Sequence, residues 1–273
     1  MKTKTALLII DAQNDFTDPK GSLYVPGAEE DIQRASDFIL RNKIKIDKIF
    51  ASFDVHSPMQ IFHSKWWKNT ETNECVEPFS AISLQDVESG KIVPVIEEDW
   101  SKHYLESLEK KGRFKHTIWP NHCILGTWGQ QLNEKIKYAV ENWQESKDHS
   151  VYMDIINKGW NPLTEFFGIF KSEVSVDSDI SSLLNYRLII DLLGYDKIYT
   201  FGEAKSHCFG ISIEQILDLA ENSDSKAQEL LSKVVIISDC CSDIPGFEGA
   251  KDDVIERAKK YGLTTQTSDF KIE

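Results

Sequence analysis

Short apolar runs recur along the chain and alternate with longer amphipathic stretches. The runs occupy residues 6–10, 49–53, 151–156, 198–201 and 234–237, and most are nearly continuous in Ile, Leu, Val and Phe. Such runs are typical of strands that are covered on both faces. The stretches between them predict helices over 28–42, 127–144, 180–193, 209–220 and 251–261. The alternation predicts an α/β fold, a three-layer α-β-α arrangement around a mostly parallel central sheet.

Residues 64–118 depart from this alternation. The segment is polar, irregular and interrupted by Pro78, Gly90 and Pro94. A segment of that length inside a compact domain is usually functional or a small subdomain. We therefore expect a single domain over residues 1–273 with an insertion at 64–118, which forms a lid or a subdomain. A surface decoration without a role in the site is the alternative.

Charge and cysteine usage exclude several classes of protein. Acidic residues outnumber basic ones by 44 to 31, so a nucleic acid is a poor partner. The five cysteines are odd in number and two are adjacent, which is not the pattern of a disulfide framework. The first apolar run has only five residues, too few for a signal segment or a membrane span. We expect a cytoplasmic protein without a membrane partner, and the sequence leaves open whether it forms a homo-oligomer.

Four of the predicted strands end in chemically active side chains. Asp11 follows the first run, Asp54 and His56 follow the second, Lys158 follows the third, and the fourth leads to Cys208. Ligands of open parallel sheets bind beyond the carboxyl ends of the strands. A lone Asp after a strand is more often a cap or turn residue, but four such ends together favour a site.

Cys208 lies at a predicted strand-to-helix turn. The positive end of a helix dipole favours the thiolate, so the sequence predicts a nucleophilic cysteine there. The alternative is a small buried hydrophobic residue, which is common for free cysteine.

The order and spacing of several short motifs are similar to those of a known family. They are Asp-Ala-Gln-Asn-Asp-Phe at 11–16, Gly-Ser-Leu-Tyr-Val-Pro-Gly-Ala at 21–28, Asp-Val-His at 54–56, Trp-Pro-Asn-His-Cys-Ile-Leu-Gly-Thr at 119–127, and Asn-Lys-Gly at 157–159. With Cys208 they resemble the cysteine hydrolases of the isochorismatase-like superfamily, and most closely the nicotinamidases, also called pyrazinamidases. The resemblance implies the isochorismatase-like hydrolase fold.

The resemblance implies a catalytic triad of Asp11, Lys158 and Cys208. Asp11 would take the thiol proton and return it to the leaving ammonia. Lys158 would stabilise the thiolate, because a nearby cation lowers the pKa of a cysteine. Lys205 is an alternative cation, ranked lower because the family's lysine lies on the earlier strand.

The family also binds the oxyanion through backbone N–H groups near the cysteine. In this chain they would be those of Ala204 and Cys208. The family's cis peptide in this turn would correspond to Glu203–Ala204.

A metal site is expected beside the triad. Asp54 and His56 are two apart and would share a face at a strand end. The resemblance adds His122 and, less firmly, His63, whose alternative role is a polar residue that opens the insertion. One carboxylate with two or three imidazoles suits one divalent ion, Zn²⁺ first, with Fe²⁺ or Mn²⁺ as alternatives.

Two aromatic residues are expected to bind the substrate. The resemblance places Phe16 and Trp119 as walls around a flat ring, although both could be plain core residues. Ser206 stands where an acidic residue is common in the family, and Val55 replaces a common aromatic residue. These departures concern the identity of the substrate rather than the hydrolytic chemistry.

The resemblance implies a metal-dependent nicotinamidase, which hydrolyses nicotinamide to nicotinate and ammonia through a cysteine thioester in pyridine nucleotide (NAD) salvage. The alternative is a related cysteine amidohydrolase that acts on another small amide or carbamoyl compound. An isochorismatase uses no cysteine nucleophile, so Cys208 argues against it. A scaffold protein with a vestigial site conflicts with the intact triad.

Overall fold

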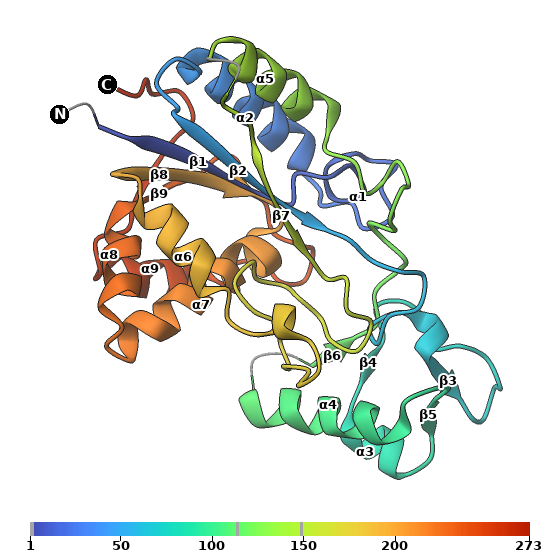
Figure 1. Ribbon diagram of the computed structural model, residues 1–273. Helices are drawn as coiled ribbons and strands as arrows, with labels where there is room; N and C mark the ends of the chain where they lie inside the picture. The colour runs from blue at the N-terminus through green and yellow to red at the C-terminus, as the bar shows by residue number, and fades with distance from the viewer. Residues whose placement is uncertain (1–2, 113–114, 148–149) are drawn as a thin grey trace.

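The computed structural model describes residues 3–112, 115–147 and 150–273. Its central sheet has the strand order β10-β9-β8-β1-β2-β7, and every neighbouring pair in it is parallel. Helices α2 and α5 cover one face, and α6 to α9 cover the other (Figure 1). The strands are β1(Thr5–Ile10), β2(Lys48–Asp54), β7(Asp154–Lys158), β8(Lys197–Gly202), β9(Val234–Ile237) and β10(Thr264–Gln266). The predicted three-layer α/β fold is confirmed.

The central strands are apolar throughout because each supplies both cores. In β1, Leu7 and Ile9 belong to the core under α2 and α5, whereas Leu8 and Ile10 belong to the core on the α6–α9 side. Successive side chains of a strand point to opposite faces, so a strand buried on both sides has no polar face.

The predicted helices are present, and polar side chains cap the first turns of two of them. The elements are α2(Ala28–Asn42), α5(Glu134–Glu145), α6(Tyr186–Leu193), α7(Gly210–Glu221) and α9(Asp252–Lys259). Helix α5 begins seven residues later than expected, where Asn133 accepts a hydrogen bond from the Lys135 amide. The region from residue 180 is split into η2(Ile180–Ser182) and α6, and the Asn185 side chain caps α6. Side-chain oxygens at these positions satisfy amides that the first helical turn leaves unpaired.

Some elements have no clear signal in the apolar pattern. Helix α8(Ser225–Lys233) is largely polar and is capped by Asp224, which accepts from the amides of Lys226 and Ala227. Strand β10 lies at the sheet edge, and its three residues are exposed. Helix α1(Asn14–Thr17) is a single turn within the first motif, and β7 begins three residues later than the run at 151–156.

The insertion is regular rather than irregular. It contains η1(Ser64–Trp66), α3(Leu84–Glu88) and α4(Glu98–Lys111), with two antiparallel pairs of short strands: β3(Trp67–Asn69) with β5(Ile92–Pro94), and β4(Ala81–Ile82) with β6(His116–Thr117). Trp66, Trp67 and Tyr104 are fully buried in it, and they join the same core cluster as the α6–α9 side of the sheet. The insertion thus has regular structure and shares a core with the sheet, and one domain over residues 1–273 with this insertion as a lid or a subdomain stays a prediction.

The described helices include none that combines the length and the apolar character needed to span a bilayer.

Strand β8 must end in glycine. Gly202 has φ +141°, and a Cβ atom added to it would lie 1.9 Å from the carbonyl oxygen of Ile10 in the neighbouring β1. We expect Gly202→Ala to lower the free energy of unfolding by about 3 kcal/mol or more, because the backbone contact cannot relax without separating the strands.

Gly90→Ala is the matched control for this prediction. Gly90 also has a positive φ, +73°, but nothing lies within 4 Å of its added Cβ. It should lose only about 1 kcal/mol, the cost of the left-handed conformation. Chemical denaturation of the two variants measures the difference, and equal losses would contradict the proposed contact with Ile10.

Candidate active site

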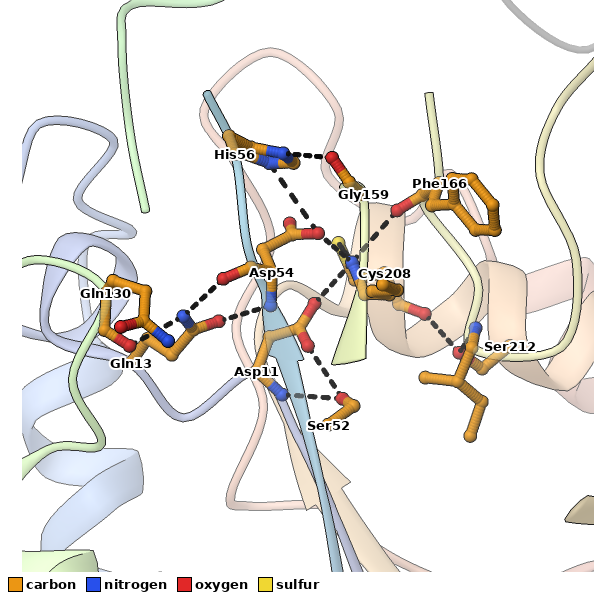
Figure 2. A network of polar contacts seen from close by, with 12 residues as sticks. Asp11, Gln13, Ser52, Asp54, His56, Gln130, Gly159, Phe166, Cys208 and Ser212 are labelled. Carbon is orange, nitrogen blue, oxygen red and sulfur yellow. Dashed lines mark hydrogen bonds and ion pairs between the residues drawn. The ribbon is translucent and has the colours of Figure 1, made fainter. Parts of the chain in front are cut away.

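The carboxyl ends of β1, β2 and β7 place three charged side chains in contact, and the turn after β8 adds a thiol. The Nζ atom of Lys158 lies 2.6 Å from Asp54 Oδ1, 2.8 Å from Asp11 Oδ2, 2.9 Å from the Phe166 carbonyl oxygen and 3.6 Å from Cys208 Sγ. Figure 2 shows Asp11, Asp54 and Cys208 converging there. All four side chains are at most 7% exposed. The structure therefore brings together the three residues predicted as the triad.

Lys205 does not compete for the cationic position. Its Nζ atom lies 3.2 Å from Asp243 and 3.0 Å from Asp252, away from Cys208.

Asp11 and Asp54 share the Lys158 ammonium, but their pKa values shift in opposite directions. Burial raises the pKa of Asp11 above its ordinary value, although Lys158 opposes the shift. Burial also acts to raise the pKa of Asp54, but Lys158 and His56 outweigh it and lower that pKa. Burial would lower the pKa of Lys158, yet Asp11 and Asp54 raise it well above the ordinary value. Asp54 therefore stays an anion and Lys158 a cation, while Asp11 is the better proton acceptor. Carboxyl groups separated in this way mark acid–base assignments.

The surroundings of Cys208, the candidate nucleophile, favour the thiol over the thiolate. Cys208 lies in η3(Lys205–Phe209), directly before α7. Burial raises the pKa of the Cys208 thiol well above its ordinary value, and Asp11 and Asp54 raise it further, whereas Lys158 lowers it. Desolvation and two carboxylates thus outweigh the helix terminus and the lysine. Because the thiol also interacts with Asp11, a route for its proton is in place.

Ser52 is hydrogen-bonded to Asp11, the candidate base, and the sequence did not predict this contact. Its Oγ donates to Asp11 Oδ1 at 2.6 Å and accepts from the Asp11 amide at 3.1 Å (Figure 2). Ser52 is fully buried in β2, two residues before Asp54. A hydroxyl inside an otherwise apolar strand, on the same face as a site residue, was the available signal.

Gln13 fixes the backbone of the metal-site strand. Its Oε1 accepts from the Asp54 amide at 2.7 Å, and its Nε2 donates to the Asp54 carbonyl at 2.8 Å and to the Gln130 carbonyl at 2.8 Å (Figure 2). The first sequence motif contains Gln13, but its composition alone does not indicate this role.

Asp54, His56 and His122 form a cluster with the chemistry of a metal site. One potential ligand atom from each lies within 4.8 Å of the others, and all three are buried. The Nδ1 atoms of His56 and His122 face carbonyl oxygens, those of Gly159 at 2.9 Å and of Pro120 at 2.8 Å. Such contacts place the proton on Nδ1 and leave Nε2 as the donor for a metal.

Gly159 makes room for this arrangement. A Cβ atom there would lie 2.4 Å from Cε1 of His56, so a side chain at this position would displace the ring.

His63 lies beside the cluster but outside the group of three. Its ring centroid is 5.9 Å from that of His56 and 5.8 Å from that of His122. Both ring nitrogens are buried and meet the criteria for a hydrogen bond with none of the described residues, although the Pro58 backbone is close enough to act on the pKa of His63. Burial, His122 and His56 lower the pKa of His63 to about 2, and burial and His56 lower that of His122 to about 4. Neutral imidazoles and an ionised carboxylate are the donors that a divalent ion takes, so these residues fit one.

The candidate nucleophile and the metal cluster line one cavity. Cys208, Asp54, His56 and His122 line it, together with both predicted aromatic residues, Phe16 and Trp119. Ala204, the predicted oxyanion donor, also lines it, and the Glu203–Ala204 peptide bond is cis as predicted. The arrangement suits covalent attack on a flat aromatic amide beside a metal ion.

Two further residues of this cavity were not predicted. Phe167 completes its aromatic wall, and Glu165 adds a carboxyl group that is 7% exposed. Burial raises the pKa of Glu165 well above its ordinary value, which favours the neutral, hydrogen-bond-donating form. Both lie on the loop after β7, where no sequence pattern indicated a site.

Comparison with known proteins finds nicotinamidases. No family model matches the chain. A nicotinamidase of Saccharomyces cerevisiae is 26% identical over 209 residues, which cover 76% of this chain and 77% of that protein.

Solved structures agree in fold. The yeast nicotinamidase bound to the inhibitor nicotinaldehyde superposes with a TM-score of 0.62 and 21% identity, covering 96% of this chain and 99% of that one. A nicotinamidase/pyrazinamidase of Acinetobacter baumannii gives 0.60 and 19%, covering 97% of each chain. A zinc complex of a Pyrococcus horikoshii pyrazinamidase gives 0.53 and 18%, covering 97% and 99%. The chain therefore has the isochorismatase-like hydrolase fold, and in sequence and structure it is similar to nicotinamidases.

Proposed function

We propose that the chain is a metal-dependent nicotinamidase, which hydrolyses nicotinamide to nicotinate and ammonia. The observation that carries the proposal is the contact of Lys158 with Asp11, Asp54 and Cys208, because Cys208 and Asp54 line one cavity with His56 and His122. The metal-site residues favour a nicotinamidase over a relative that acts on other small amides or carbamoyl compounds. The sequence similarity to the yeast nicotinamidase adds independent support.

The first half-reaction uses Asp11 as the base. Asp11 takes the Cys208 proton as Sγ attacks the carboxamide carbon, which forms a C–S bond and a tetrahedral oxyanion. The backbone N–H groups of Ala204 and Cys208 would stabilise that oxyanion. Asp11 then returns the proton to the departing nitrogen, the C–N bond breaks, and ammonia leaves a thioester.

The second half-reaction regenerates the thiol. Asp11 deprotonates a water molecule that attacks the thioester, the C–S bond breaks, and nicotinate forms. The thiolate that leaves recovers its proton from Asp11. Throughout, the Lys158 ammonium lies within 3.6 Å of Sγ and 2.8 Å of Asp11, so it offsets the negative charge that moves between them.

Asp54, His56 and His122 would hold the metal, with His63 as a fourth candidate. A divalent ion there supplies a fixed positive charge that orients a pyridine nitrogen and water. Zn²⁺ is the first choice for this donor set, with Fe²⁺ and Mn²⁺ as alternatives. Phe16 and Trp119 would hold the ring between their faces.

The reaction would return nicotinate to pyridine nucleotide biosynthesis. A cytoplasmic location stays a prediction, and the five free cysteines are compatible with a reducing compartment.

Ammonia release from nicotinamide by the purified, metal-loaded protein tests the function. We expect kcat/KM of about 10⁴ M⁻¹s⁻¹ or more, within the normal range of enzymes. Cys208→Ala should reduce release to background because no other residue replaces the nucleophile, whereas Cys75→Ala, on the exposed surface of the insertion, should match the parent. Retained release by Cys208→Ala would contradict the covalent mechanism. Absent release from a metal-loaded parent would leave the related-amidohydrolase alternative.

Ser52→Ala should lower kcat by about tenfold or more with little change in KM. The variant leaves a buried carboxylate oxygen of Asp11 without its donor, and a hydrogen bond to a charged group contributes about 1.5–3 kcal/mol. Ser52→Thr keeps the hydroxyl and should recover most of the rate. Steady-state kinetics on variants with parental melting temperatures checks this, and an unchanged kcat in Ser52→Ala would refute a positioning role.

Metal analysis after gel filtration should find about one divalent ion per chain in the parent. His56→Ala and His122→Ala should lose it, because each removes an Nε2 donor from the cluster. His63→Ala should bind it more weakly, because its buried nitrogens have no other partner in the described part of the chain. The exposed His103 on α4 offers the control His103→Ala. Full occupancy in His63→Ala would assign His63 to packing alone.

A further inference from the structure

A wide groove adjoins the catalytic cavity and is not used by the proposed reaction. Its volume is about 840 Å³, and most of its lining is apolar. One wall comes from the insertion through Phe79, Ala81 and Thr117, and the facing wall comes from the segment between β9 and α9 through Pro245 and Phe247.

The groove and the catalytic cavity adjoin and share part of their walls. Both are lined by the same five residues: Leu23, Trp119, Phe167, His207 and Ile244. A substituent on a ring held against Trp119 would therefore have to pass only these side chains to enter the groove.

Aromatic rings lead from the cavity to the surface along this path. The ring centroids of Phe79 and Trp119 are 6.1 Å apart, those of Trp119 and His207 are 5.5 Å apart, and those of His207 and Phe247 are 4.8 Å apart, each pair edge-to-face. The outer rings are open to solvent, since Phe79 is 63% exposed and Phe247 is 40% exposed. Exposed rings at the mouth of an apolar groove are suited to stacking with another flat apolar group.

The direction of the groove decides which part of a substrate can enter it. In the proposed reaction the leaving nitrogen approaches Asp11, which is fully buried and does not line the groove. A substituent on that nitrogen would meet the core. Asp54, His56 and His122 line the cavity but not the groove, so a ring nitrogen turned toward them would also point away from it. Carbon 5 of nicotinamide is the one ring position adjacent to neither that nitrogen nor the amide-bearing carbon, so this orientation would direct it toward the groove.

We propose that the enzyme also hydrolyses primary aromatic carboxamides that carry a second apolar ring at this position, and that the groove binds the second ring. This inference rests on the proposed function, because it uses the same nucleophile and the same orientation of the amide. As with nicotinamide, the amide and one water molecule give the substituted carboxylate and ammonia.

The test compares nicotinamide with nicotinamide that carries a phenyl group at carbon 5. We expect the parent to hydrolyse the phenyl compound with kcat/KM equal to or above that for nicotinamide. The double variant Phe79→Ala/Phe247→Ala should lower the ratio of the two constants by about tenfold, the scale of a lost aromatic contact in a pocket. Tyr138→Ala removes an aromatic side chain of similar exposure, 57%, from helix α5 and should leave the ratio unchanged.

A binding measurement makes the test independent of turnover. Quenching of tryptophan fluorescence should show that the product 5-phenylnicotinate binds the parent more tightly than nicotinate by about tenfold, and the double variant should lose the difference. A parent that turns over nicotinamide but not the phenyl compound, or a ratio insensitive to the double variant, would overturn the inference alone. Release of aniline from N-phenylnicotinamide would show that the enzyme accepts a ring on the amide nitrogen, and this would overturn the proposed position of the second ring. Turnover of neither amide would overturn the proposed function as well.

Discussion

The buried ammonium of Lys158 is the interaction on which the rest of the site depends. It neutralises Asp11 and Asp54, two carboxylates that burial would otherwise keep from being charged together. Asp11 directly follows β1, and Asp54 and Lys158 end β2 and β7, so the ion pairs require three strands to stop at the same level of the sheet. A buried charge that loses its partner costs several kcal/mol. The ion pairs of the site therefore depend on the register of the sheet.

The same constraint shapes the chemistry. Burial and two neighbouring carboxylates raise the pKa of Cys208, which favours the thiol. In the proposed mechanism the proton therefore moves during attack, and Asp11 is the acceptor because Lys158 and His56 keep the pKa of Asp54 low. The Lys158 ammonium thus lies beside two carboxyl groups with different roles in the proposed mechanism: Asp11 is the base, and Asp54 keeps its negative charge. Ser52 and Gln13 then fix the side chain of one acid and the backbone of the other.

Much of this could be predicted from the sequence because it follows from local patterns. Strands β1 and β2, which are buried on both faces, leave apolar runs that Asp11 and Asp54 follow directly, and Lys158 comes two residues after the third run. The features that the sequence pattern did not predict depend on tertiary contacts. Strand β10 is recognisable only as a partner of β9, and the protonation of Cys208 follows from burial that no local pattern encodes. Glu165 enters the cavity from a loop whose path the packing of the insertion and α7 decides.

The residues that the sequence predicted and those that it did not predict form different parts of the site. Asp11, Asp54 and Lys158 lie at strand ends, and a sheet can give the close positioning that proton transfer and covalent attack require. The walls of the groove, which we propose meet the far side of a substrate, come instead from the insertion and from the segment between β9 and α9. Loops tolerate change that a sheet does not. A chain built in this way can alter which amide it accepts through residues such as Phe79 and Phe247, while the contacts of Lys158 stay as they are.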